Sequence, residues 1–228
     1  YDIIVNKVNG QVLAIDGAND SLIWKITLPG TEGYTLPAIG YFNSDSVPDI
    51  YCNYAIGVFP DLPRSVRFMA DGRTGDILYR DTVNAFQYAS GVVADLNGDG
   101  FDEVLVNQSE GKRKQFEDIY FNYLYVFDFH NNRQYVLGDT VRATNFASTP
   151  WIGDVDGDGM FDIVHAEVNY QDILFDLEQP VGLYIGLLRT GIRINRPAVW
   201  GAYMGSGYSN VFRQPGRSFG PRKIPGQN

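Results

Sequence analysis

Two short segments place oxygen-bearing side chains at regular intervals. Residues 95–103 read DLNGDGFDE and residues 154–162 read DVDGDGMFD, so both have oxygen ligands at positions 1, 3, 5 and 9 and a glycine at position 6. Ca²⁺ takes about six to eight hard oxygen ligands, and a backbone carbonyl at position 7 adds another. We therefore expect two calcium sites, with the ligands Asp95, Asn97, Asp99, Phe101 and Glu103 in one and Asp154, Asp156, Asp158, Met160 and Asp162 in the other.

Electrostatics favours a bound cation over the alternative, which is a pair of solvated Asp/Gly turns between strands. Two carboxylates 4 Å apart repel by roughly 4 kcal/mol at an effective dielectric constant of 20, and the glycine at position 6 permits the turn that gathers the ligands. An EF-hand is excluded because its position 12 requires a glutamate, whereas Val106 or His165 stands there.

A third, incomplete copy of the segment begins at Tyr41. It keeps Asn43, Asp45 and Asp49 but has Tyr41 at position 1 and Ser46 in place of the glycine, so we expect it to hold no metal. The first positions of the three copies lie 54 and 59 residues apart.

The elements that must position these loops repeat in phase with them. Three predicted strands end in aspartate, at Asp16, Asp71 and Asp128, and each is followed by a polar turn and another strand. A weaker fourth copy spans residues 183–194, with a turn expected at 189–191. Helical periodicity is absent, which favours an all-β protein. A unit of about 55 residues with four short strands is typical of a β-propeller blade, which must stack on neighbouring blades to bury both faces.

The loops resemble the calcium-binding motif of FG-GAP/VCBS repeats, found in the propellers of integrin α-subunits and in bacterial surface proteins. The resemblance covers residues 1 to about 205 and implies a β-propeller of about four blades, part of a larger one with seven. It also implies one calcium ion within each complete loop as a structural brace. Residues 206–228 are rich in Gly, Pro and basic side chains, which predicts a tail or linker. Some hairpins resemble quinoprotein-like propellers more loosely.

The first residues match the strand that follows each loop. Asp2 takes the ninth position, and residues 3–5 take the place of the strand that begins at Ile50, Val104 or Ile163. The sequence therefore predicts that a further loop and blade precede Tyr1 in a longer chain.

Composition excludes some classes of function. The chain has 228 residues and a net charge of −9, which argues against a nucleic-acid partner. It has no apolar run of the roughly 18 residues needed to span a membrane. Cys52 is the only cysteine and is predicted to be a small buried apolar residue. Neither His130 nor His165 belongs to a nucleophile or zinc motif.

Two connections, residues 108–122 and 169–180, are longer than a blade requires. They are equally compatible with recognition loops and with plain solvated insertions. Trp151 and Trp200 are expected to pack between blades, with stacking on a sugar as the alternative role. The predicted function is a non-catalytic, calcium-stabilised extracellular module, secreted or at the cell surface, that binds a protein or glycan as in adhesion. The alternative is the propeller domain of a polysaccharide lyase or a quinoprotein-like oxidoreductase.

Overall fold

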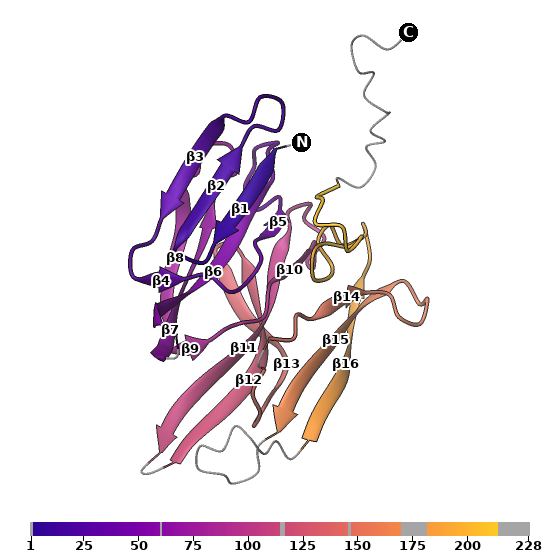
Figure 1. Cartoon of the computed structure of the whole chain (residues 1–228). Coiled ribbons are helices and arrows are strands. Elements are labelled where there is room, and N and C mark those ends of the chain that lie inside the picture. The colour runs from indigo at the N-terminus through magenta and orange to yellow at the C-terminus, as the bar shows by residue number, and fades with distance from the viewer. Residues whose placement is uncertain (1, 60, 115–116, 146, 170–181, 214–228) are drawn as a thin grey trace.

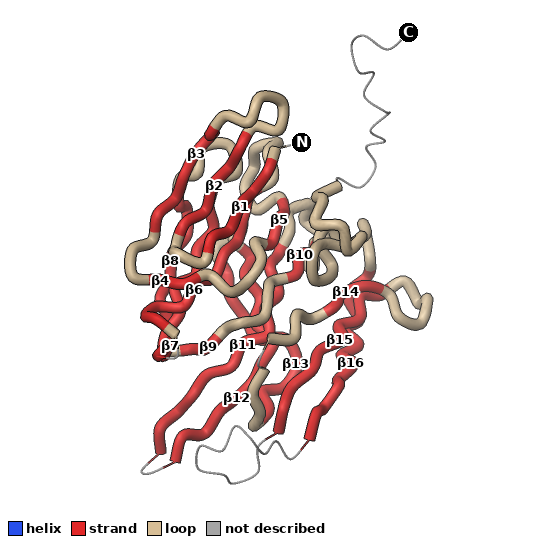
Figure 2. Tube along the Cα trace, viewed as in Figure 1, coloured by secondary structure: helices blue, strands red, loops and turns tan. Residues whose placement is uncertain are grey.

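The computed structural model describes residues 2–59, 61–114, 117–145, 147–169 and 182–213. Within these ranges the protein is all-β, with sixteen strands in four antiparallel sheets, none of them closed on itself, and no helix (Figures 1 and 2). The same ranges therefore hold no helix that could cross a membrane.

The four sheets follow one another along the chain. Sheet 1 contains β1 (Ile3–Lys7), β2 (Gln11–Ile15) and β3 (Leu22–Thr27). Sheet 2 contains β4 (Thr31–Glu32), β5 (Ala38–Gly40), β6 (Asp49–Val58), β7 (Asp61–Ala70) and β8 (Ile77–Val83). Sheet 3 contains β9 (Ala85–Phe86), β10 (Val92–Ala94), β11 (Glu103–Lys114), β12 (Glu117–Asp128) and β13 (Arg133–Val141). Sheet 4 contains β14 (Trp151–Gly153), β15 (Met160–Asn169) and β16 (Gly182–Arg193).

Neighbouring sheets pack face to face, because successive side chains of a strand point to opposite faces. In β6, Ile50, Cys52 and Tyr54 contact sheet 1, whereas Tyr51 contacts sheet 3. Sheets 2 and 3 are thus buried on both faces, which explains the continuous burial of β6 from residue 49 to residue 55. Cys52 is 1% exposed, as predicted.

Sheet 3 packs on sheet 4 in the same way. Leu105, Leu124 and Val126 of sheet 3 contact Phe161 and Ile163 of sheet 4. The other face of sheet 4 is uncovered within the described residues, and its apolar side chains are exposed: Leu183 by 69%, Ile185 by 66% and Leu187 by 46%.

Three sheets share one order of elements, which positions the acidic loops. In each, a short strand (β5, β10 or β14) is followed by a loop and then by a longer strand that pairs with it (β6, β11 or β15). The three short strands lie next to one another (Figure 1). Sheet 1 contains only the equivalents of the three later strands, since Ile3 pairs with Ile15 as Ile50 pairs with Ala70. Asp2 therefore occupies the place of Asp49 ahead of its strand.

The segment that follows β16 returns to the short strands. Trp200 exchanges two backbone hydrogen bonds with Val93 of β10, at 2.9 and 3.2 Å, and Gly201 O accepts from Ile152 N of β14 at 2.8 Å. Trp200 is 1% exposed and packs in the core between sheets 2 and 3. Trp200 was expected to pack between blades, and it does lie between two sheets, in an irregular segment; that these sheets are propeller blades stays a prediction.

Two expected connections take a different form. Residues 108–122 are not a loop, because β11 and β12 continue as a paired hairpin out to the Lys114–Glu117 pair. The turn expected at residues 189–191 is a bulge within β16, where Thr190 Oγ1 donates to Phe161 O at 2.6 Å and Gly191 has a φ of 67°. The other long connection, residues 169–180, lies outside the described residues apart from Asn169, as does the tail beyond residue 213.

Candidate metal centre

The three loops between the short and long strands share hydrogen bonds at equivalent positions. The backbone N–H of position 2 donates to the carboxylate of position 9 in each loop: Phe42 to Asp49 at 3.1 Å, Leu96 to Glu103 at 2.6 Å, and Val155 to Asp162 at 2.9 Å. The N–H of position 7 donates to the carboxylate of position 5: Val47 to Asp45 at 2.8 Å, Phe101 to Asp99 at 2.9 Å, and Met160 to Asp158 at 2.8 Å. The loops therefore fold back on their own acidic side chains.

The glycines of the two complete loops adopt left-handed backbone conformations. Gly98 and Gly100 have φ values of 77° and 93°, and Gly157 and Gly159 have values of 81° and 80°. Residues with a Cβ rarely adopt this conformation. The incomplete loop has Ser44 and Ser46 at these positions, and neither has a positive φ.

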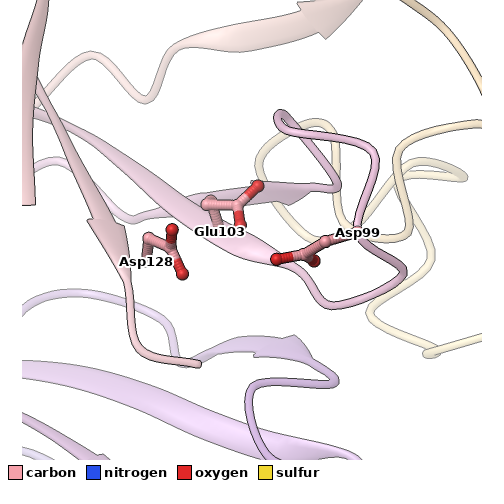
Figure 3. Close-up of side chains that lie close together, drawn as sticks. All are labelled: Asp99, Glu103 and Asp128. Carbon is pink, nitrogen blue, oxygen red and sulfur yellow. The ribbon is translucent and has the colours of Figure 1, made fainter. Parts of the chain in front are cut away.

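Three carboxyl groups converge at the second loop, and we name them cluster 1. Asp99 comes from the loop, Glu103 from the start of β11 and Asp128 from the end of β12 (Figure 3). One oxygen of each lies within 4.8 Å of the others. Glu103 and Asp128 are buried and Asp99 is exposed, so cluster 1 opens to solvent on the side of the loop.

Strand register brings Asp128 into cluster 1. Val104 pairs with Phe127, which places Asp128 opposite Glu103 at the end of the ladder. Asp128 also caps its own turn, because its Oδ1 accepts from Asn131 N at 2.9 Å. Asp128 was not among the ligands expected from the loop sequence. The signal available was the aspartate that recurs at the end of the equivalent strand in sheets 1 and 2.

Without a bound cation, burial and the nearby acids disfavour the ionised form of the Glu103 carboxyl group in cluster 1. Burial raises the pKa of Glu103 from 4.5 to about 8, and the charges of Asp128, Asp99 and Asp95 add to the rise. The pKa of Asp99 is lowered even though partial burial opposes this, because Phe101 N–H and the Asn131 amide donate to its carboxylate. A cation at cluster 1 would relieve the repulsion.

The other expected ligands of the second loop surround cluster 1 without joining it. Asn97 Nδ2 donates to Glu103 Oε1 at 2.9 Å and to Asp128 Oδ2 at 3.3 Å. Asp95 accepts from the backbone of its own loop, from Gly98 N at 2.7 Å and Gly100 N at 3.1 Å. The ring of Phe101 stacks on His130, with centroids 3.5 Å apart.

A basic side chain from beyond β16 pairs with two buried acids of the second loop. Arg196 Nε lies 3.3 Å from Asp95 Oδ2, and Arg196 Nη2 lies 2.7 Å from Asp102 Oδ1. Burial raises the pKa of Asp102 to about 6, against the lowering effects of Tyr41 N–H and of the Arg196 charge. Arg196 also donates to Gly100 O at 3.0 Å, so it fixes the loop from outside.

The third loop forms cluster 2, which consists of Asp154, Asp156 and Asp162. Asp162 is buried and the other two are exposed, with one oxygen of each within 4.8 Å of the others. Asp158 does not join cluster 2. Arg189 stands opposite Asp162 in the strand ladder, as Asp128 stands opposite Glu103 in sheet 3. The Nη2 atom of Arg189 lies 3.2 Å from Asp156 Oδ2. Arg189 thus takes the place in sheet 4 that Asp128 takes in sheet 3, and Asp128 itself pairs with an arginine, because Arg133 Nη2 lies 3.1 Å from Asp128 Oδ2.

The incomplete loop of sheet 2 reproduces part of this arrangement. Asn43 Nδ2 donates to Asp49 Oδ1 at 2.9 Å and to Asp71 Oδ2 at 3.3 Å, the same contacts that Asn97 makes. Asp45 instead pairs with Arg73, at 3.5 Å. No cluster of three possible metal ligands is found at this loop among the described residues.

The donor set of both clusters fits a hard divalent cation. Calcium binds oxygen at about 2.3–2.6 Å, so two oxygens on one ion lie at most about 5 Å apart, and the spacing of 4.8 Å or less meets that limit. Carboxylates alone do not distinguish calcium from other oxygen-preferring cations.

No protein-family model matches the chain, and no curated protein matches it.

Proposed function

We propose that the protein is a calcium-stabilised β-propeller segment of the FG-GAP/VCBS type and acts as a rigid, non-catalytic binding module. Its four sheets would be consecutive blades. The observation that carries the proposal is cluster 1, in which three carboxylates converge beneath a loop whose hydrogen bonds recur in two other sheets.

The sheet arrangement supports the architectural part of the proposal. Sheets 1 to 4 stack face to face in chain order, with the short strands β5, β10 and β14 next to one another. Propeller blades stack in this way around an axis lined by their innermost strands.

Calcium would be held by Asp99, Glu103 and Asp128 in one loop and by Asp154, Asp156 and Asp162 in the other. Bound there, it would neutralise buried carboxylates and tie the loop to the hairpin that follows. Sites of extracellular modules bind calcium with dissociation constants of about 10⁻⁴ to 10⁻³ M. A secreted or cell-surface location, and a protein or glycan as partner, belong to this proposal.

The test is calcium-dependent thermal stability. With free calcium at about ten times the dissociation constant, each site adds roughly 1.4 kcal/mol, which raises the melting temperature by several degrees. Asp128→Asn should remove about half of this response, since it takes one carboxylate from cluster 1. The Asn oxygen can still accept from Asn131 N, so the turn cap is kept.

Asp71→Asn is the matched control. Asp71 directly follows the equivalent strand of sheet 2, β7, and its carboxylate caps the turn by accepting from Arg73 N and Thr74 N. The loop beside it has no cluster of three possible metal ligands among the described residues. This variant should keep the full calcium response. A wild-type melt that chelator leaves unchanged, or an equal loss of response in both variants, would contradict the proposal.

A further inference from the structure

Sheet 4 ends one strand earlier, on its outer side, than the other three sheets. The strand equivalent to β16 is β12 in sheet 3, because Ile163 pairs with Leu188 as Val104 pairs with Phe127. The corresponding strands β2, β7 and β12 each pair on their outer side with a further strand, which is β3, β8 or β13. Among the described residues β16 has no such partner and forms the edge of its sheet (Figure 1).

The course of the chain explains why this strand is missing. In the other sheets an aspartate caps a turn directly after the equivalent strand, and the chain reverses there. Arg189 stands at that position in sheet 4, and β16 continues to Arg193, which pairs with Met160. The chain then returns to the short strands, where Trp200 pairs with Val93. It does not run back alongside β16, so the edge stays open within the described residues.

The open stretch of β16 also lacks the usual protection of a sheet edge. An edge strand presents a row of unpaired backbone N–H and C=O groups, and proteins commonly place charged side chains there to prevent further pairing. The outer strands β3, β8 and β13 carry such side chains, among them Lys25, Arg80 and Asp139. Residues 182–188 of β16 read GLYIGLL and carry no charge. This stretch is therefore able to accept another strand.

The same stretch is complementary to itself. If two copies of β16 pair antiparallel about a two-fold axis at Ile185, Leu183 lies opposite Leu187 of the second copy, and Tyr184 lies opposite Gly186 of the second copy. Like charges do not meet, because the first arginine, Arg189, lies beyond this stretch. Apolar cross-strand pairs stabilise an antiparallel sheet, and a two-fold interface requires a surface that fits itself.

We propose that β16 pairs with β16 of a second copy of this chain, antiparallel and centred on Ile185. The two three-stranded sheets would join edge to edge into one continuous sheet. The second copy would supply the strand that β3, β8 and β13 supply within one chain, so the pairing continues an arrangement already present in three sheets. Neither acidic cluster takes part, so this inference goes beyond the proposed function and holds with or without calcium.

The dimer should be a weak one, because a single pair of strands buries little surface. Dilution should therefore return a monomer in which β16 is open. Light scattering from the whole 228-residue chain over a range of concentrations, in calcium and in chelator, tests this. We expect the mass to rise from 25.5 kDa towards twice that value as the concentration increases.

Two lysine variants locate the contact. Ile185→Lys should weaken the dimer about tenfold, because two like charges would lie directly opposite each other. Ile185 is 66% exposed in the monomer, so the fold should be retained, and a melt in dilute solution checks this. The matched control is Leu78→Lys on β8, since Leu78 is 54% exposed on an edge strand outside the pairing. It should dimerise as the wild type does.

Cysteine cross-linking tests the register. The only native cysteine, Cys52, is buried and should not interfere. Leu183→Cys mixed with Leu187→Cys should cross-link under mild oxidation faster than either variant alone, because antiparallel pairing places these two positions opposite each other. A monomer at every concentration, species larger than two chains, equal dimerisation of wild type and Ile185→Lys, or equal cross-linking in all mixtures would overturn the proposal.

Discussion

The carboxylate of Asp49 is fully buried at a loop that lacks a cluster of metal ligands. Burial raises its pKa from 3.8 to about 6, although the N–H groups of Gly72, Phe42 and Asn43 act to lower it. The folded state therefore holds this proton more tightly than the unfolded chain does. The resulting stabilisation is fully present below about pH 4 and is lost as pH rises through about 6.

We predict that the free energy of unfolding falls by about 2–3 kcal/mol over this pH range because of Asp49. Urea unfolding at pH 4 to 7 in chelator, for the wild type and Asp49→Asn, measures the effect. The variant should be less stable overall, since an amide cannot accept all the hydrogen bonds of the carboxylate, but its pH dependence should be flatter by this amount. Parallel pH profiles would refute the assignment.

An arginine lies beside each acidic cluster, Arg133 at cluster 1 and Arg189 at cluster 2. The guanidinium group of Arg189 lies 3.2 Å from Asp156 Oδ2 and would compete with any cation at cluster 2. Exposed ion pairs contribute about 0–1 kcal/mol, so Arg189→Gln should tighten calcium binding at the third loop by up to about fivefold. Calorimetric titration of the variant in an Asp128→Asn background isolates that loop. Unchanged or weaker affinity would show that Arg189 does not compete.

Residue spacing predicts a candidate ligand only when the ligand lies within one loop. The spacing singled out Asp99 and Glu103, which the structure brings together. It could not identify Asp128, which reaches cluster 1 from the next strand through the register of Val104 with Phe127. Nor could it foresee that Asp95 would bond to its own loop and to Arg196, a contact across 101 positions of sequence.

At the scale of elements, Arg67 joins sheets 2 and 3. It is 3% exposed, donates to Gln108 at 2.6 Å and to Asp81 at 3.0 Å, and lies over the ring of Phe127 at 4.5 Å. Its position is fixed by three strands in addition to its own, β8, β11 and β12. Removing one partner of a buried ion pair leaves the other charge buried and unpaired, and this destabilises a fold by more than replacing both residues with apolar ones does.

Asp81→Ala should therefore destabilise the protein by about 2–4 kcal/mol, at the lower end because water reaches Asp81. The double variant Arg67→Met, Asp81→Leu should be less destabilised than this single variant, because no unpaired charge remains buried. Chemical denaturation measures both. A double variant less stable than the single one would contradict this, and would mean that the remaining contacts of Arg67 with Gln108 and the Phe127 ring stabilise the fold by more than its unpaired charge costs.

Strand patterns predicted most elements but not their extent. The strands that lead to Asp16, Asp71 and Asp128 are present, although β2 and β7 end one residue before the aspartate. Residues 108–122 were expected to form a connection because the segment is longer than a propeller blade requires. Backbone pairing continues there regardless, since each residue added to β11 finds a partner in β12. Hydrogen bonding of this kind needs no particular side chain, and a sequence pattern does not reveal it.

At the scale of the whole molecule, the sequence predicted the all-β class and the order of strands around each loop. That the four sheets belong to the closed ring of a propeller stays a prediction. The face-to-face order of the sheets depends on which side chains point each way from a strand such as β6, and thus on register. The irregular contact of Trp200 with Val93 has no periodic sequence signal at all.

Sheets 2 and 3 are each buried on both faces, so the four sheets form a row in which each sheet packs on the next. We call each packed interface between two sheets a coupling. Within the described residues each inner sheet has two such couplings and each outer sheet has one, so opening should begin at the outer sheets and move inward. Native-state hydrogen exchange followed by mass spectrometry should show β6, β7, β11 and β12 as the slowest to exchange and β1–β3 and β16 as the fastest. Uniform protection would indicate a single cooperative unit. A substitution that destabilises sheet 4 should therefore lower the protection of sheet 3 more than that of sheet 2.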